Sequence, residues 1–121
     1  MPPIKYVSST EIRQYFNDGR YDDLVAYGAL SEKLIREGRP SAQASQVPGT
    51  KSQVVAYLDP KGRQIAIVHQ YMRPDKKLGG SGKPDPKKLL HNGTLYILDE
   101  SLWRVINTRQ FAITLEMHTV R

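Results

Sequence analysis

Residues 52–73, SQVVAYLDPKGRQIAIVHQYMR, contain the pattern that decides the fold. Two runs of apolar, mostly β-branched residues flank Asp59-Pro60-Lys61-Gly62. Proline fixes the φ angle of the second turn position, and glycine adopts the positive φ of a bulge-type hairpin. The sequence therefore predicts a β-hairpin with strands at 52–58 and 63–73. Both strands are apolar on both faces at mid-length, which is typical of strands at the centre of a sheet.

Two helices are predicted ahead of this hairpin. Ser8 and Glu11 have the spacing of a capping box, and apolar residues follow at helical intervals until Asn17-Asp18-Gly19. A second series of apolar residues at helical spacing predicts a helix over 22–37. Residues 39–51 are rich in small and turn-forming residues, so they predict a connection. We expect the second helix to cover one face of the sheet.

A glycine-rich basic loop follows the hairpin and interrupts the sheet over 74–93. Asp85 before Pro86 is typical of a helix start and Asn92-Gly93 of a helix end, so a short helical turn is predicted between them. Three further strands are predicted at 94–98, 102–106 and 111–117.

These elements predict a single α+β domain over residues 1–121, in which two N-terminal helices pack on an antiparallel sheet of about five strands. The last strand, 111–117, alternates strictly between apolar and polar residues. Such a strand is expected at a sheet edge, where it could pair with a second copy of the chain and form a homodimer.

The composition excludes several classes of function. The chain has no cysteine, which removes disulfides, thiolate catalysis and cysteine-ligated metal sites. His69, His91 and His118 lie far apart in the sequence, so we predict no metal site and no cofactor. The N-terminus lacks the pattern of a secretory signal, and no uncharged run approaches the length of a membrane span. We therefore expect a cytoplasmic protein without a membrane partner.

Positive charge is concentrated in one segment of a chain whose net charge is +6. Residues 73–88 contain six basic and two acidic residues, and such a cluster attracts phosphate groups. This predicts binding of RNA or DNA through loop 73–88, although a solvated loop that serves solubility would have the same composition. The predicted phosphate-binding residues are Arg73, Lys76, Lys77, Lys83, Lys87 and Lys88.

His69, Tyr71 and Arg73 alternate along one predicted strand and therefore project from the same face. An imidazole can accept a proton, a phenol can donate a hydrogen bond, and a guanidinium can bind a phosphate. Metal-independent cleavage of RNA requires these three roles, so the trio is a candidate catalytic set. In the structural alternative, His69 and Tyr71 pack in the core beside Ile65 and Ile67.

Two shorter patterns partly match known site motifs. Residues 79–83, GGSGK, lack the spacing and the Ser or Thr of a nucleotide-hydrolase loop, although their backbone N–H groups could form an anion nest. Pro74-Asp75 and Asp85-Pro86-Lys87 match the permissive P-D…[D/E]-x-K pattern of metal-dependent nucleases. That chemistry needs its second element on a strand, and proline disfavours a paired strand, so Asp85 is interpreted as a helix cap.

The segments HQYMRPD (69–75) and GGSGKPDPK (79–87) resemble small uncharacterised bacterial proteins of the kind carried on mobile DNA. This resemblance implies a bacterial or phage source and no activity. Helices followed by an antiparallel sheet are also similar in architecture to RelE-type ribonuclease toxins, without a motif specific to them. Three functions therefore remain open: a nucleic-acid-binding domain, a metal-independent ribonuclease, and a self-associating structural or small-ligand-binding protein.

Overall fold

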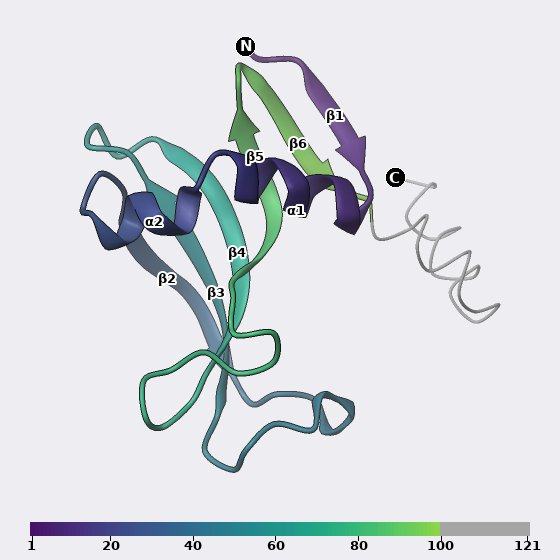
Figure 1. Cartoon of the computed structure of the whole chain (residues 1–121), viewed down its shortest axis with the longest axis vertical. Helices are drawn as coiled ribbons and strands as arrows, with labels where there is room; N and C mark the ends of the chain where they lie inside the picture. The colour runs from purple at the N-terminus through teal and green to yellow at the C-terminus, as the bar shows by residue number, and fades with distance from the viewer. Residues whose placement is uncertain (100–121) are drawn as a thin grey trace, which may run out of the picture.

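The structure is a computed structural model that describes residues 1–99. These residues form a six-stranded sheet in the order β1-β6-β5-β4-β3-β2, with two short helices on one side of it (Figure 1). Only β1 and β6 pair in parallel, so the sheet is mixed. The elements are β1 (Ile4–Val7), α1 (Ser9–Asp18), α2 (Tyr21–Ala26), β2 (Ser31–Gly38), the 3-10 turn η1 (Ala42–Ala44), β3 (Lys51–Leu58), β4 (Gln64–Met72), β5 (Asp85–His91) and β6 (Thr94–Leu98).

The predicted α+β class is confirmed, but the described sheet has six strands rather than about five. The strands predicted at 52–58, 63–73 and 94–98 are present as β3, β4 and β6. The strands predicted at 102–106 and 111–117, and the homodimer through the latter, lie outside the described residues. Across residues 1–99, no helix has the length and apolar character needed to cross a membrane.

The helix predicted over 22–37 is wrong beyond its first turns. The helix α2 ends at Ala26, where Gly28 takes a φ of +83°. The Gly28 N–H donates to Val25 O over 3.0 Å, and the Ala29 N–H donates to Leu24 O over 2.9 Å. These two bonds form a Schellman motif, which terminates a helix at a left-handed glycine. The apolar residues that fitted a helical period farther along lie instead on the edge strand β2.

The short helix predicted from Asp85 to Asn92 is also wrong, because these residues form β5 and the turn that follows it. Asn92 and Gly93 have φ angles of 49° and 82° between the paired residues His91 and Thr94. Two central residues with positive φ make the type I′ turn of a tight hairpin, for which Asn-Gly is the preferred sequence. The register of β5 against β4 shifts between Ile67 and Val68, and this irregularity accommodates the proline at position 86.

The hydrophobic core lies between the helices and one face of the sheet. The helix α1 begins at a Ser8 cap, whose Oγ accepts from the Glu11 N–H over 3.2 Å, as the capping-box spacing predicts. Its buried residues Ile12 and Phe16 join the core cluster formed by the sheet. The Phe16 ring lies 6.1 Å from the Tyr57 ring. One face of the sheet is therefore covered by α1 and α2, and we call the opposite one the open face (Figure 1).

Candidate functional site

Alternation along β4 divides its residues between the two faces of the sheet. Ala66, Val68 and Gln70 are buried beneath the helices, whereas His69 and Tyr71 are half-buried and project to the open face. The prediction that the trio projects from one face is therefore correct for His69 and Tyr71. They share this face with Ile67, as the structural alternative also expects, and they are only partly buried.

One row of side chains crosses four strands on the open face. The register pairs Arg36 with Val54, Val54 with His69, and His69 with Asp85. Directly opposed residues of antiparallel strands lie on the same face, so these four side chains are neighbours although they come from β2, β3, β4 and β5. The sheet thereby brings a guanidinium, an imidazole and a carboxylate into one line.

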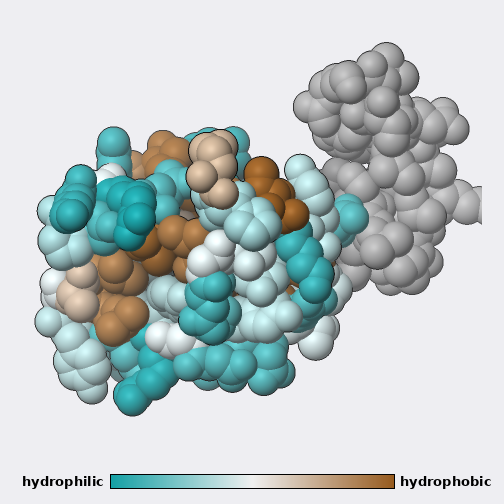
Figure 2. All heavy atoms as spheres, turned by 90° about the horizontal axis from the view of Figure 1, so that it is seen from above, coloured by the Kyte–Doolittle hydropathy of each residue, from teal (hydrophilic) through white to brown (hydrophobic). Residues whose placement is uncertain are grey.

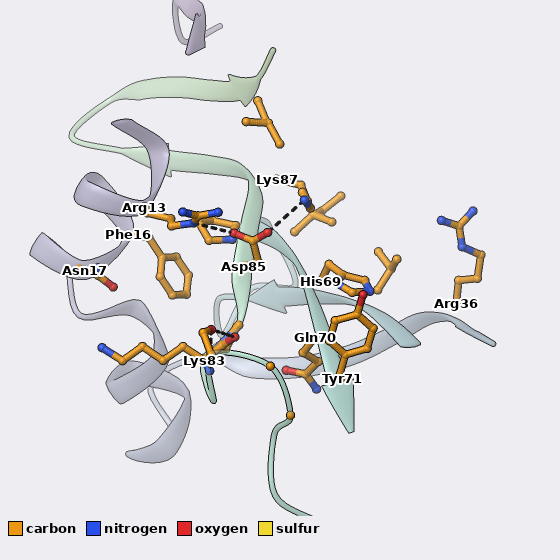
Figure 3. Close-up of a pocket in the computed structure, with 18 of the residues that line it drawn as sticks. Arg13, Phe16, Asn17, Arg36, His69, Gln70, Tyr71, Lys83, Asp85 and Lys87 are labelled. Atoms are coloured by element: carbon orange, nitrogen blue, oxygen red, sulfur yellow. Dashed lines mark hydrogen bonds and ion pairs between the residues drawn. The ribbon is translucent and has the colours of Figure 1, made fainter. Parts of the chain in front are cut away.

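A cleft with a volume of about 1040 Å³ surrounds the N-terminal end of β5. Its walls come from both sides of the sheet, because β6 ends at Leu98 and its register with β5 begins only at Lys88. Arg13 and Asn17 of α1 line one side, and His69, Tyr71 and Arg36 line the other (Figure 3). The glycine-rich segment 79–81 closes the lower end.

Asp85 is held by two cations at the centre of this cleft. Arg13 Nε donates to Asp85 Oδ1 over 3.1 Å, and Lys87 Nζ donates to Asp85 Oδ2 over 3.2 Å (Figure 3). Partial burial by itself would raise the pKa of Asp85, but hydrogen bonds and charge from Arg13 and Lys87 hold that pKa below its ordinary value. The carboxylate is therefore ionised at neutral pH and orients both cations.

His69 is held as a neutral base. Its Nε2 lies 2.7 Å from the hydroxyl of Ser52, and its ring meets the Tyr71 ring edge-on with 4.7 Å between centroids. Burial lowers the pKa of His69, and the positive charges of Lys87 and Arg36 lower it further against the opposing effect of Asp85. The imidazole is thus mostly uncharged near pH 7 and can accept a proton.

The charged side chains that line the cleft are mainly positive. Within residues 1–99, two carboxylates are among them, and one of these, Asp85, already forms two ion pairs. Backbone with positive φ at Gly80 and Gly82 shapes the loop beside them. A concave site with excess positive charge favours an anionic ligand such as a phosphate. The cations are Arg13, Arg36, Lys83 and Lys87.

The predicted site residues do not all come together. His69, Tyr71, Lys83 and Lys87 line the cleft, and Lys88 lies on the open face opposite Ile67. The remaining predicted cations, Arg73, Lys76 and Lys77, are not among the residues that line it.

Arg73 departs from the predicted trio because β4 ends at Met72. Its N–H donates to Lys77 O in a tight turn, and its buried Nε has no hydrogen-bond partner within residues 1–99. A Cβ at Gly79 would lie 3.3 Å from this Nε, so the guanidinium stem packs against the glycine-rich segment. Arg73 therefore supports the loop and does not face the cleft with His69.

The nuclease-like pattern is only half assembled. Asp85 and Lys87 do lie on a strand, contrary to the prediction that proline would prevent it. Asp75, however, lies in an exposed turn, where its carboxylate accepts from the Lys77 N–H over 2.9 Å, and it does not line the cleft. No group of three potential metal ligands occurs in the described part of the chain. The geometry gives this pattern no metal-binding pair of carboxylates.

Sequence reasoning missed three residues of the site. The helix predicted over 22–37 includes Arg36, but Gly28 before its strand is a signal that would place Arg36 on β2. The sequence predicts Ser52 only as the start of a strand, and its contact with His69 follows from the β3–β4 register. Arg13 reaches Asp85 through the packing of α1, for which the sequence holds no local signal.

Comparison of the chain with protein-family models, curated proteins and solved structures finds no match. The resemblance to proteins of mobile DNA and the similarity to RelE-type toxins therefore stay predictions.

Proposed function

We propose that this protein is a small nucleic-acid-binding domain that holds a backbone phosphate in the cleft around β5. The observation that carries the proposal is the arrangement of Arg13 and Lys87 on the two oxygens of Asp85, with Arg36 in the same row across the sheet. These cations are oriented before any ligand arrives, which reduces the entropy lost on binding. A phosphate that approaches the row meets positive charge from three separate elements.

The cations of this site are not the same set as those of the predicted loop 73–88. Lys83 and Lys87 belong to that loop and to the strand after it, but Arg13 and Arg36 come from α1 and β2. The proposed ligand is therefore bound by the fold, and not by a lysine-rich loop alone. Neutralisation of phosphates by such residues releases counterions, so affinity should fall steeply with salt.

The test is fluorescence anisotropy with labelled RNA and DNA oligonucleotides between about 50 and 200 mM salt. We expect the double variant Arg36→Ala/Lys87→Ala to weaken binding at least tenfold. The matched control is Lys61→Ala, which removes an exposed cation from the β3–β4 turn, away from the cleft. Absence of binding by the wild-type protein at the lowest salt, or equal affinity of the double variant and the control, would overturn the proposal.

A second candidate function is metal-independent cleavage of RNA, favoured by the neutral His69 beside these cations. In this reaction His69 accepts the proton of a ribose 2′-hydroxyl while the 2′-oxygen attacks phosphorus. The bond to the 5′-oxygen breaks, a 2′,3′-cyclic phosphate forms, and water returns a proton to the leaving oxygen. Tyr71 would position the phosphate, and Lys87 or Lys83 would stabilise its added charge, in place of Arg73.

The ribonuclease candidate is tested by cleavage of RNA in the presence of a chelator. We expect His69→Gln to abolish cleavage while circular dichroism shows a folded protein. His91→Gln is the matched control, because His91 stacks with Tyr15 on the helix side of the sheet. Cleavage that survives His69→Gln, or that stops when divalent ions are removed, would reject this mechanism.

A further inference from the structure

A second row of side chains crosses all six described strands on the open face, and most of it lies outside the cleft. The register links Lys33, Ala56, Ile67, Lys88, Ile97 and Tyr6 in this order from β2 to β1. We propose that this face is a platform for single-stranded nucleic acid, which lies across the sheet and enters the cleft at one end. The inference rests on the proposed function and names the class of its ligand.

The two faces of β2 differ in the sign of their charge. Lys33 and Arg36 are in register with the open-face residues Ala56 and Val54. Glu32 and Glu37 are in register with Tyr57 and Gln53, on the helix side. A bulge between Leu34 and Arg36 lets the two cations share a face although they are three positions apart.

Positive charge therefore extends over the open face beyond the cleft. Lys88 adds a third cation at the centre of the sheet, opposite Ile67. Among the described open-face positions of the paired strands, the only carboxylate is Asp85, which Arg13 and Lys87 already neutralise. These cations on β2 and β5 complement the phosphates of a nucleic-acid strand that crosses this part of the sheet.

Aromatic rings are placed on the same face. Tyr6 on β1 is 65% exposed, and Tyr71 on β4 projects beside His69. Since neighbouring strands lie about 4.8 Å apart, three strand spacings separate β1 from β4 by roughly 14 Å. The two tyrosines can thus receive different bases of one strand. Stacking of bases on such rings is the usual way in which sheet platforms hold single-stranded nucleic acid.

A duplex fits this face less well. Readout of a duplex groove needs a helix or a two-stranded ribbon that enters the groove. Both described helices lie on the other side of the sheet (Figure 1). Bases paired within a duplex are also stacked on one another and cannot reach Tyr6 or Tyr71. The combination of a cationic sheet and exposed rings therefore selects an unpaired strand.

The experiment compares a labelled single-stranded oligonucleotide, as RNA and as DNA, with a duplex of the same sequence. We expect the single strand to bind at least tenfold more tightly than the duplex. Tyr6→Ala should weaken single-strand binding about fivefold or more. Lys33→Ala should reduce the slope of log affinity against log salt by about one. The matched controls are Tyr27→Ala, which removes a tyrosine 78% exposed at the end of α2, and Lys61→Ala.

The outcomes separate the platform from the cleft. Equal affinity for single strand and duplex would overturn the platform. Tyr6 also lines the cleft, so Lys33→Ala is the variant that separates the two. The platform would also be overturned if Lys33→Ala bound like Lys61→Ala while Arg36→Ala/Lys87→Ala lost binding, and in that case the proposed cleft would stand. Absence of binding to every oligonucleotide would reject both. A preference for RNA over DNA would identify contacts with the 2′-hydroxyl.

Discussion

Arg13 and Asp85 are 72 residues apart in the sequence, yet Nε of the arginine donates to Oδ1 of the aspartate over 3.1 Å. The bond joins α1 to the first residue of β5. Lys87 occupies the other oxygen of the same carboxylate over 3.2 Å. Asp85 therefore fixes the positions of two cations and attaches the helix to the strand within the cleft.

Loss of this ion pair should reduce stability only modestly. The Arg13 and Asp85 side chains are 55% and 34% exposed, so solvent screens the pair, and we expect Arg13→Ala to lower the free energy of unfolding by about 0.5–1 kcal/mol. The measurement is urea denaturation at pH 7. The pKa of Asp85 should rise in the variant, because a neighbouring cation no longer favours the carboxylate. An unchanged Asp85 pKa in a carboxyl NMR titration would contradict this account of the site.

Stability should fall as the pH is lowered through the titration of His69. Its pKa is lower in the folded protein than the ordinary value of 6.5, so the unfolded chain binds more protons in the window below about pH 6.5. The free energy of unfolding contributed by this residue is therefore complete at neutral pH and decreases on acidification through that window. Denaturation at several pH values should show a weaker dependence for His69→Gln than for the wild type. Equal slopes would mean that the folded environment does not disfavour the imidazolium.

Gly28→Ala distinguishes the observed helix end from a continuous helix. A Cβ at Gly28 would meet no atom within 4 Å, but its φ of +83° disfavours any L-residue with a side chain. We expect the substitution to lower the free energy of unfolding by about 1–2 kcal/mol. In a helix over 22–37 the same change would instead stabilise the protein by up to about 1 kcal/mol. The sign measured by chemical denaturation decides between the two structures.

The β5–β6 turn gives a parallel test of the second incorrect helix. Gly93 has a φ of +82° with no atom near its missing Cβ, so Gly93→Ala should destabilise the fold by about 1 kcal/mol or more. Asn92→Gly should change the stability far less, because glycine also adopts the φ of 49° found there. Similar effects of the two substitutions would be inconsistent with a type I′ turn.

The sequence predicts the elements whose signals are local. The Asp59–Gly62 turn and the apolar runs beside it specify the β3–β4 hairpin, and the Ser8 cap specifies the start of α1. The incorrect helices arose from signals with two meanings. Asn92-Gly93 ends helices and also forms tight hairpins, and the apolar spacing after Gly28 fits a helix by coincidence. Both segments are decided by pairing with distant strands, which overrides the local pattern.

Only the residues of the candidate site that lie on a single strand could be predicted from the sequence. His69 and Tyr71 share a face because side chains alternate along β4. Arg73 continues that alternation in the sequence but follows the end of the strand, so it turns away. Asp85 and Arg36 join His69 through the registers of three strand pairs, and no local pattern encodes those registers.

The surface of the open face changes character along the strands. Towards the end farthest from loop 73–84 it is built from apolar side chains, among them Ile4, which is 54% exposed, and the paired Leu90 and Leu95. Figure 2, seen from above, shows apolar side chains that reach the surface at this end of the molecule. The row that contains Arg36, His69 and Asp85 lies with the cleft at the other end.

Pro86 affects how β5 is held at the cleft. A proline has no N–H to donate, so the pairing of β5 with β4 is weaker there than in a regular strand. The side-chain hydrogen bonds from Arg13 and Lys87 to Asp85 stabilise this part of β5 in addition to the backbone hydrogen bonds of the sheet. An incoming anion that draws either cation away from Asp85 would weaken these contacts. Binding in the cleft is consequently linked to local opening of the first residues of β5. The rate of amide hydrogen exchange at Lys87 and Lys88 measures this link.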